Sequence, residues 1–239
     1  MTRTHVVTGA GSGIGHALAT RLAERGDRLV LPVRSAERAA QIQAEFGPEH
    51  LVAVLDLAAP EGRASGLAGL VDTLTSAGWG VDSLVHSAGV VDLAEVAEFE
   101  ESAWATQIQV NLTAPAALTG ALLPFLRRAR GSVVFVNSTS GLVANPTWGA
   151  YAASKHGLRG LADSLRGEEA RHGVRVTSVF PSRTATAMQA RVHSQEKRDY
   201  HPEVWMRPES VAASLLHVLD LPADATITEL TIRTSPSPS

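Results

Sequence analysis

The chain contains no cysteine in its 239 residues. Disulfides, thiolate nucleophiles and metal sites built on cysteine are therefore excluded. An excess of charge of one sign is also missing, because 21 basic and 24 acidic residues leave a formal net charge of −3. Such a balance provides no broad basic surface for nucleic acid or an anionic membrane, and we expect neither as a partner.

Long apolar runs are absent as well. No stretch approaches the roughly 18 apolar residues that a membrane-spanning helix needs, and the first residues lack the apolar core of a signal peptide. We therefore expect a soluble cytoplasmic protein, with 44% hydrophobic residues to fill its core. Apart from His86, the histidines are scattered without attendant carboxylates, so we expect no metal site.

Lysine and tyrosine are scarce, with two of each, yet one of each lies in the segment GAYAASKHG. Tyr151 and Lys155 are four positions apart, so on a helix they share one face. An ammonium at that distance can lower the pKa of a phenol by about 1–3 units, which suits acid–base catalysis. The alternative is a solvated surface pair, and the rest of the chain must decide between the two.

Short β-rich runs alternate with longer helical patterns along the whole chain. The run at 132–137 is apolar almost throughout, as a strand covered on both faces by helices requires. This alternation predicts a doubly wound parallel α/β sheet in one domain over 1–233, followed by a disordered tail at 234–239. We expect strands at 3–8, 28–33, 51–55, 82–86, 132–137, 174–180 and 226–232, and helices at 14–25, 35–46, 61–77, 102–128, 151–172 and 208–219.

A glycine-rich turn follows the first expected strand and opens the first expected helix. The turn reads T-G-x-x-x-G-x-G, without the Gly-Lys-Ser/Thr of a Walker loop. Its glycines let the backbone approach a ligand, and the helix start favours a pyrophosphate. A tight turn without a ligand is the alternative. The residues expected to contact the pyrophosphate are Gly9, Gly11, Ser12, Gly13, Ile14 and Gly15.

The ends of the second and third strands bear on the choice of dinucleotide. An acid after the second strand would bind a plain ribose, but Val33 stands there and Arg34 follows. The fork of Arg34 suits a 2′-phosphate, which predicts NADP(H) as the preferred cofactor with NAD(H) possible. Asp56, followed by Leu57, could place a carboxylate near the adenine amino group. A surface arginine and a loop-starting aspartate are the plain alternatives.

Two further positions complete a pattern with Tyr151 and Lys155. Ser138 lies 13 residues before Tyr151 at a strand end, and Asn111 lies within the expected helix 102–128. Together with the glycine turn, this set resembles the short-chain dehydrogenase/reductase family, in its single-domain branch, over essentially the whole chain. The resemblance implies a Rossmann-type sheet and an oxidoreductase that transfers hydride between nicotinamide and a carbonyl or secondary alcohol.

The resemblance also assigns roles to residues. It makes Tyr151 the acid–base, Lys155 its activator and a ligand of the nicotinamide ribose, Ser138 the binder of the substrate oxygen, and Asn111 the holder of a water. A polar residue satisfied at a helix bend is the alternative for Asn111. The remaining residues expected at the cofactor are Ala88, Gly89, Pro181, Thr184 and Thr186.

Two positions depart from the family pattern. His86-Ser87 replaces Asn-Asn after the fourth strand, and Ser182 replaces the glycine of Pro-Gly after the sixth. We interpret His86 as a structural hydrogen-bonding residue and not a catalytic base. At Ser182, a backbone conformation that is easy for glycine must be met by serine or altered.

Several questions remain open from the sequence alone. A mobile lid is expected near 187–207, with Val90–Phe99 and Leu142–Trp148 as the other walls, but no substrate class is favoured. A catalytically silent sensor of the same fold, or a sugar-nucleotide epimerase or dehydratase, are the rival functions. Helices 102–128 and 151–172, which pair across a two-fold axis in the family, predict a homodimer or homotetramer, with the strand at 226–232 as a second contact.

Overall fold

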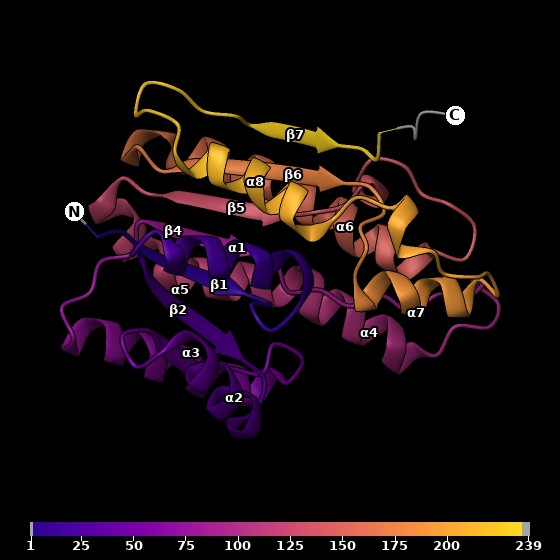
Figure 1. Ribbon diagram of the computed structural model, residues 1–239, viewed down its shortest axis with the longest axis horizontal. Helices are drawn as coiled ribbons and strands as arrows, with labels where there is room; N and C mark the ends of the chain where they lie inside the picture. The colour runs from indigo at the N-terminus through magenta and orange to yellow at the C-terminus, as the bar shows by residue number, and fades with distance from the viewer. Residues whose placement is uncertain (1, 236–239) are drawn as a thin grey trace.

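A computed structural model describes residues 2–235 of the protein (Figure 1). All seven strands form one parallel sheet in the order β3-β2-β1-β4-β5-β6-β7, which confirms the predicted fold. The strands begin within one residue of the prediction, except the last, which begins at Glu229 where 226 was expected. The strands are β1 (Thr4–Thr8), β2 (Arg28–Val33), β3 (Leu51–Val54), β4 (Ser83–His86), β5 (Ser132–Val136), β6 (Arg175–Pro181) and β7 (Glu229–Ile232).

Helices cover both faces of this sheet, and each face has its own apolar core. On one face α1 and α8 lie side by side with α2 at the edge, and α3, α5 and α6 cover the other (Figure 1). The interior strand β5 is buried at every position, as its unbroken apolar run predicts. The helices are α1 (Gly13–Glu24), α2 (Ala36–Phe46), α3 (Pro60–Ser76), α4 (Glu101–Ile108), α5 (Ala114–Ala129), α6 (Gly149–Glu169), α7 (Ala187–Gln195) and α8 (Pro208–Leu219).

The expected helix 102–128 is not a regular α-helix. A π-helical turn at Gln109–Thr113 separates α4 from α5 and carries Asn111. The whole stretch Glu101–Ala129 is long and apolar enough to cross a membrane by length and composition, with a mean hydropathy of 1.2. Its apolar residues Leu118, Leu122 and Phe125 are buried against the rest of the protein, so we describe it as a core helix.

A second difference lies within 187–207, where only a lid was expected. Residues Ala187–Gln195 form α7, and the side chain of Thr186 caps it by accepting a hydrogen bond from the Gln189 N–H. A short bridge between Thr184 and Met206 returns the segment to the end of β6. The segment is therefore tied down at both of its ends.

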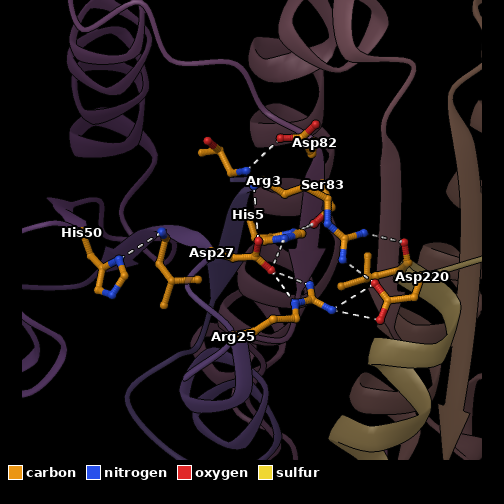
Figure 2. A network of polar contacts seen from close by, with 11 residues as sticks. Arg3, His5, Arg25, Asp27, His50, Asp82, Ser83 and Asp220 are labelled. Atoms are coloured by element: carbon orange, nitrogen blue, oxygen red, sulfur yellow. Dashed lines mark hydrogen bonds and ion pairs between the residues drawn. The ribbon is translucent and has the colours of Figure 1, made fainter. Parts of the chain in front are cut away.

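The amino ends of the strands are joined by a network of polar side chains (Figure 2). Buried His5 lies on β1, with its Nδ1 2.7 Å from Ser83 Oγ on β4 and its Nε2 3.3 Å from Asp27 Oδ2. Arg25 then links Asp27 to Asp220, which lies just after α8. This network connects two strands and two helices at the amino ends of the strands.

Candidate active site

A cleft of about 920 Å³ lies at the carboxyl ends of the strands. The strand order reverses between β1 and β4, and in open parallel sheets this reversal opens a crevice for ligands. Of the predicted site residues, all but Gly15 and Asn111 line this cleft. Those that line it are Gly9, Gly11, Ser12, Gly13, Ile14, Arg34, Asp56, Leu57, Ala88, Gly89, Ser138, Tyr151, Lys155, Pro181, Thr184 and Thr186.

The glycine turn is shaped for close approach. Gly9 has a φ of +73°, and a Cβ there would lie 2.8 Å from the backbone nitrogen of Ala88. A Cβ on Gly15 would lie 2.5 Å from the Gly9 carbonyl oxygen, so Gly15 permits the turn to pack without lining the cleft. Ser12 precedes α1 without a side-chain cap, which leaves the first N–H groups of the helix to a ligand. The turn therefore fits the diphosphate of a dinucleotide.

Two arginines stand at the far end of the cleft from Tyr151. Arg34 is exposed and follows the buried Val33. Arg38, one helical turn later on α2, also lines the cleft and donates a hydrogen bond of 2.5 Å to the Gly11 carbonyl. From the sequence, only Arg34 was predicted to contact the cofactor. Its spacing of four residues from Arg38, at the start of an expected helix, was a signal that both side chains lie on the same side. Glu37 and Asp56 contribute two carboxylates to the same end.

Tyr151 and Lys155 are both buried on α6. Burial raises the pKa of the Tyr151 phenol to about 12, although its hydrogen bond with Ser138 acts in the opposite direction. Burial also lowers the pKa of Lys155 to about 8. The Lys155 ammonium donates to the Val136 carbonyl at 3.1 Å and lies 5.6 Å from the centroid of the Tyr151 ring. In the protein alone, burial therefore dominates the pKa of Tyr151, and the expected depression by Lys155 is not present.

Asn111 lies beside this group and not at the cleft surface. Its Nδ2 donates to the Val90 carbonyl at 2.8 Å and to Ser154 Oγ at 3.0 Å, and its Oδ1 accepts from the Val90 N–H at 2.8 Å. The side chain is thus satisfied at a helix irregularity, as the plain alternative had it. It holds the segment after β4 against α6.

Comparison with known proteins identifies the family to which this chain belongs. The model of the short chain dehydrogenase family matches residues 3–197. The chain belongs to the short chain dehydrogenase family. An uncharacterized oxidoreductase of Staphylococcus epidermidis is 29% identical over 229 residues, which covers 95% of this chain and 95% of that protein.

Solved structures of the family superpose closely. A short chain dehydrogenase from Shigella flexneri complexed with NADP has a TM-score of 0.85 at 30% identity, with 98% of this chain and 97% of that one covered. An alcohol dehydrogenase from the archaeon Thermococcus sibiricus complexed with 5-hydroxy-NADP has a TM-score of 0.85 at 26% identity, with both chains fully covered. Another neighbour, 4-hydroxyisoleucine dehydrogenase, holds NADH. This short chain dehydrogenase is therefore an NAD(P)-dependent oxidoreductase that acts on CH–OH and C=O groups.

The first departure from the short chain dehydrogenase pattern, His86, has a structural explanation. Its Nε2 lies 2.8 Å from Thr119 Oγ1 on α5, and its ring stacks on Phe135 with the centroids 5.0 Å apart. Burial, with a smaller effect of Lys155, lowers the pKa of His86 to about 3. The imidazole is therefore neutral and joins β4 to α5, which agrees with a structural hydrogen bond at this position.

The second departure, Ser182, introduces no positive φ into the backbone. Ser182 is not among the non-glycine residues with positive φ in the described part of the chain, so it needs no glycine conformation. Its Oγ accepts a hydrogen bond of 3.0 Å from the Thr234 N–H. The first residue of the expected disordered tail is thus hydrogen-bonded to the site loop, and residues 236–239 lie outside the described part.

The substrate end of this dehydrogenase is walled mainly by apolar side chains. The expected walls contribute Val90, Val91, Asn145 and Trp148 to the cleft, and the expected lid contributes Ala187, Met188, Gln189 and Val192. Tyr200, Trp205 and Met206 from the expected lid do not line it. Arg183, which follows Ser182, also lines the cleft and was not predicted from the sequence.

Proposed function

We propose that this short chain dehydrogenase reduces a carbonyl compound with NADPH. Tyr151 donates a proton to the substrate oxygen, Ser138 hydrogen-bonds that oxygen, and Lys155 places its ammonium beside both the phenol and the ribose of the cofactor. Asn111 supports the arrangement through Val90 and Ser154. When bound, NADPH supplies the hydride. The rival catalytically silent sensor would bind the dinucleotide without consuming it.

The protonation state of the Tyr151 phenol suits the reductive direction. A group with a pKa of about 12 keeps its proton at neutral pH. The reductive direction needs a proton donor, whereas the oxidative direction needs a phenolate. Tyr151 is therefore better prepared for reduction near pH 7, and the Lys155 ammonium offsets part of the negative charge that develops after proton transfer.

The observation that carries the proposed preference for NADPH is the pair Arg34 and Arg38. Both line the cleft beyond the glycine turn, and Val33 offers no carboxylate to an unphosphorylated ribose. A charge-assisted contact contributes about 1.5–3 kcal/mol, or roughly tenfold to a hundredfold in affinity. Glu37 offsets part of this positive charge, but its carboxylate is exposed and water screens it.

The test compares kcat/KM for NADPH and NADH in the wild type, in Arg34→Ala and in Arg38→Ala. We expect the wild type to favour NADPH, and each substitution to lower the ratio by about tenfold. Arg21→Ala, which removes an exposed arginine from α1, is the control and should leave the ratio unchanged. A wild type that favours NADH, or a ratio that survives both substitutions, would refute the assignment of a 2′-phosphate site.

We also propose a cytoplasmic homo-oligomer. Small residues face outward on the helices that the family uses for pairing, namely Ala105 on α4, Gly120 on α5, and Ala153 and Gly160 on α6. Small exposed side chains let two such helix faces approach closely, and closed two-fold symmetry is the commonest outcome.

A further inference from the structure

Arg183 stands one aromatic ring away from the reacting phenol. It follows β6, and its guanidinium carbon lies 5.8 Å from the ring centroid of Trp148 and 5.6 Å from that of Trp205. The Trp148 ring in turn meets the Tyr151 ring edge-on, with the centroids 5.7 Å apart. An arginine at this place would ordinarily be the group that recognises a substrate carboxylate.

This arginine already has a carboxylate partner. It donates two hydrogen bonds to Glu196, one of 2.9 Å from Nη1 to Oε2 and one of 2.6 Å from Nη2 to Oε1. The side chain of Glu196 is only 14% exposed, and that of Arg183 is 28% exposed. The hydrogen bond from Arg183 lowers the pKa of Glu196, although burial opposes it, so the carboxylate is ionised at neutral pH. The pair is bidentate, largely shielded from water and neutral as a unit.

The rest of the substrate end offers little for a charged substrate. Among the described residues that line the cleft, four other charged side chains, Arg34, Glu37, Arg38 and Asp56, come from β2, α2 and the segment after β3, at the cofactor end. Lys155, beside Tyr151, donates to a backbone carbonyl. The remaining wall carries no charge: it combines the apolar Val91, Val110, Trp148, Met188 and Val192 with uncharged polar side chains such as Thr106, Asn145 and Gln189.

We infer that the substrate is a neutral carbonyl compound with an apolar or aromatic substituent, and that Glu196 prevents Arg183 from binding a carboxylate. The substituent lies against Trp148 and Val192, next to Tyr151. This inference rests on the proposed function and names the substrate class of that site. A substrate carboxylate would lose its hydration without gaining Arg183 as a partner, because Glu196 occupies that guanidinium, and a substrate ammonium would meet Lys155. Glu196 is thus a specificity-determining residue that acts through Arg183.

A matched pair of substrates tests the inference. Ethyl benzoylformate and benzoylformate carry the same aromatic ketone, but only the second is an anion. With NADPH we expect kcat/KM for the ester to exceed that for the acid by about a hundredfold. Glu196→Gln frees the positive charge of Arg183, and the ratio should fall about tenfold through a gain on the acid. Glu203→Gln, which changes an exposed acid in the same segment, is the control and should keep the wild-type ratio.

A second measurement removes the dependence on turnover. Binding of the two compounds to the protein loaded with NADP⁺ can be followed by tryptophan fluorescence, with Trp148→Phe to identify the responding ring. Tighter binding of the ester supports the inference even in a chain that consumes no NADPH, and that combination would refute the proposed function alone. Preference for the acid in the wild type would mean that Arg183 leaves Glu196 for the substrate, which overturns the inference. So would an unchanged ratio in Glu196→Gln.

Discussion

The two tyrosines of the chain have different surroundings. Tyr151 is buried beside Lys155 and Val91, whereas Tyr200 is half-buried against the ring of His193, with the centroids 5.1 Å apart. Both carry the same phenol, so the difference in their chemistry comes from position alone. Because desolvation holds the proton on Tyr151, this side chain donates a proton readily only when a strong base, such as a forming alkoxide, stands next to it.

We predict that Tyr151→Phe removes turnover and keeps cofactor binding. The substitution deletes one oxygen and leaves the ring against Trp148, so the packing persists. Loss of a general acid lowers the rate by about 10²–10⁴-fold, while the dissociation constant for NADPH should stay close to that of the wild type. Steady-state kinetics and fluorescence titration measure the two quantities. Tyr200→Phe is the matched control, and equal rates in the wild type and Tyr151→Phe would sink the assignment.

At the scale of elements, the junction of β1 with α1 is the most constrained turn at the site. Oγ1 of Thr8 accepts hydrogen bonds of 3.1 Å from the N–H groups of Ser87 and Ala88, which fixes this turn to the one after β4. Gly9, in the first turn, packs against the backbone of Ala88 in the second. A side chain there has no room to relax, because the atoms that it would meet belong to the backbone.

We predict that Gly9→Ala weakens NADPH binding by about tenfold or more and lowers the stability of the apoprotein by about 1–3 kcal/mol, since the left-handed φ and the clash add. Gly69→Ala on α3 is the control. A Cβ at Gly69 meets nothing within 4 Å, so this helical substitution should stabilise the fold by about 0.5–1 kcal/mol. Thermal denaturation and NADPH titration measure both. A Gly9→Ala protein with wild-type affinity would contradict the diphosphate assignment.

The regular elements could be predicted from the sequence because their signals are local. Short apolar runs located all seven strands, and helical periodicity located α1, α2, α3, α6 and α8. The π turn around Asn111 could not be predicted in this way. The side chain of Asn111 there hydrogen-bonds to Val90 and Ser154, which are distant in sequence, so no local pattern indicates it. Likewise α7 carries mixed polar and apolar residues with no strong period, so only its contacts with the cleft define it.

The site shows the same division. The glycine turn and the pair Tyr151 and Lys155 are short motifs and were readable. The pairing of Arg183 with Glu196 depends on how the segment after β6 folds back, and the pKa of Tyr151 depends on how many side chains cover it. Neither quantity has a local sequence signal.

For the whole molecule, the network of Figure 2 makes stability depend on pH. Burial lowers the pKa of His5 from 6.5 to about 4, so between these values the unfolded chain binds a proton that the folded chain does not. The free energy of unfolding therefore falls as the pH falls from about 6.5 to about 4. His5 alone should account for about 2 kcal/mol between pH 7 and pH 5, and buried His86 adds a loss of the same sign.

The measurement is urea denaturation of the wild type and His5→Gln at pH 7 and pH 5. We expect the variant to lose about 2 kcal/mol less than the wild type over this interval. His217→Gln, which changes an exposed histidine on α8, should follow the wild type. Equal losses in the wild type and His5→Gln would mean that folding leaves the pKa of His5 near 6.5, and a smaller loss in the wild type would mean an ion pair of protonated His5 with Asp27.

The proposed oligomer is tested at the same scale. Light scattering at micromolar concentration should return a multiple of the chain mass of 25.1 kDa, with two or four copies. We expect Gly160→Glu to lower the mass toward one copy, because a charged side chain would enter the helix pairing on α6. A single-copy mass for the wild type would refute the oligomer and leave the oxidoreductase assignment intact.

The polar network lies at the amino ends of the strands, and the cleft lies at their carboxyl ends, on the opposite side of the same sheet. No residue labelled in Figure 2 lines the cleft, and effects at sites without shared partners add independently. The loops around the substrate can therefore change while the opposite edge retains its folding free energy. Descendants of this chain can therefore vary cleft residues such as Met188 while the network at the amino ends keeps its contribution to the folding free energy.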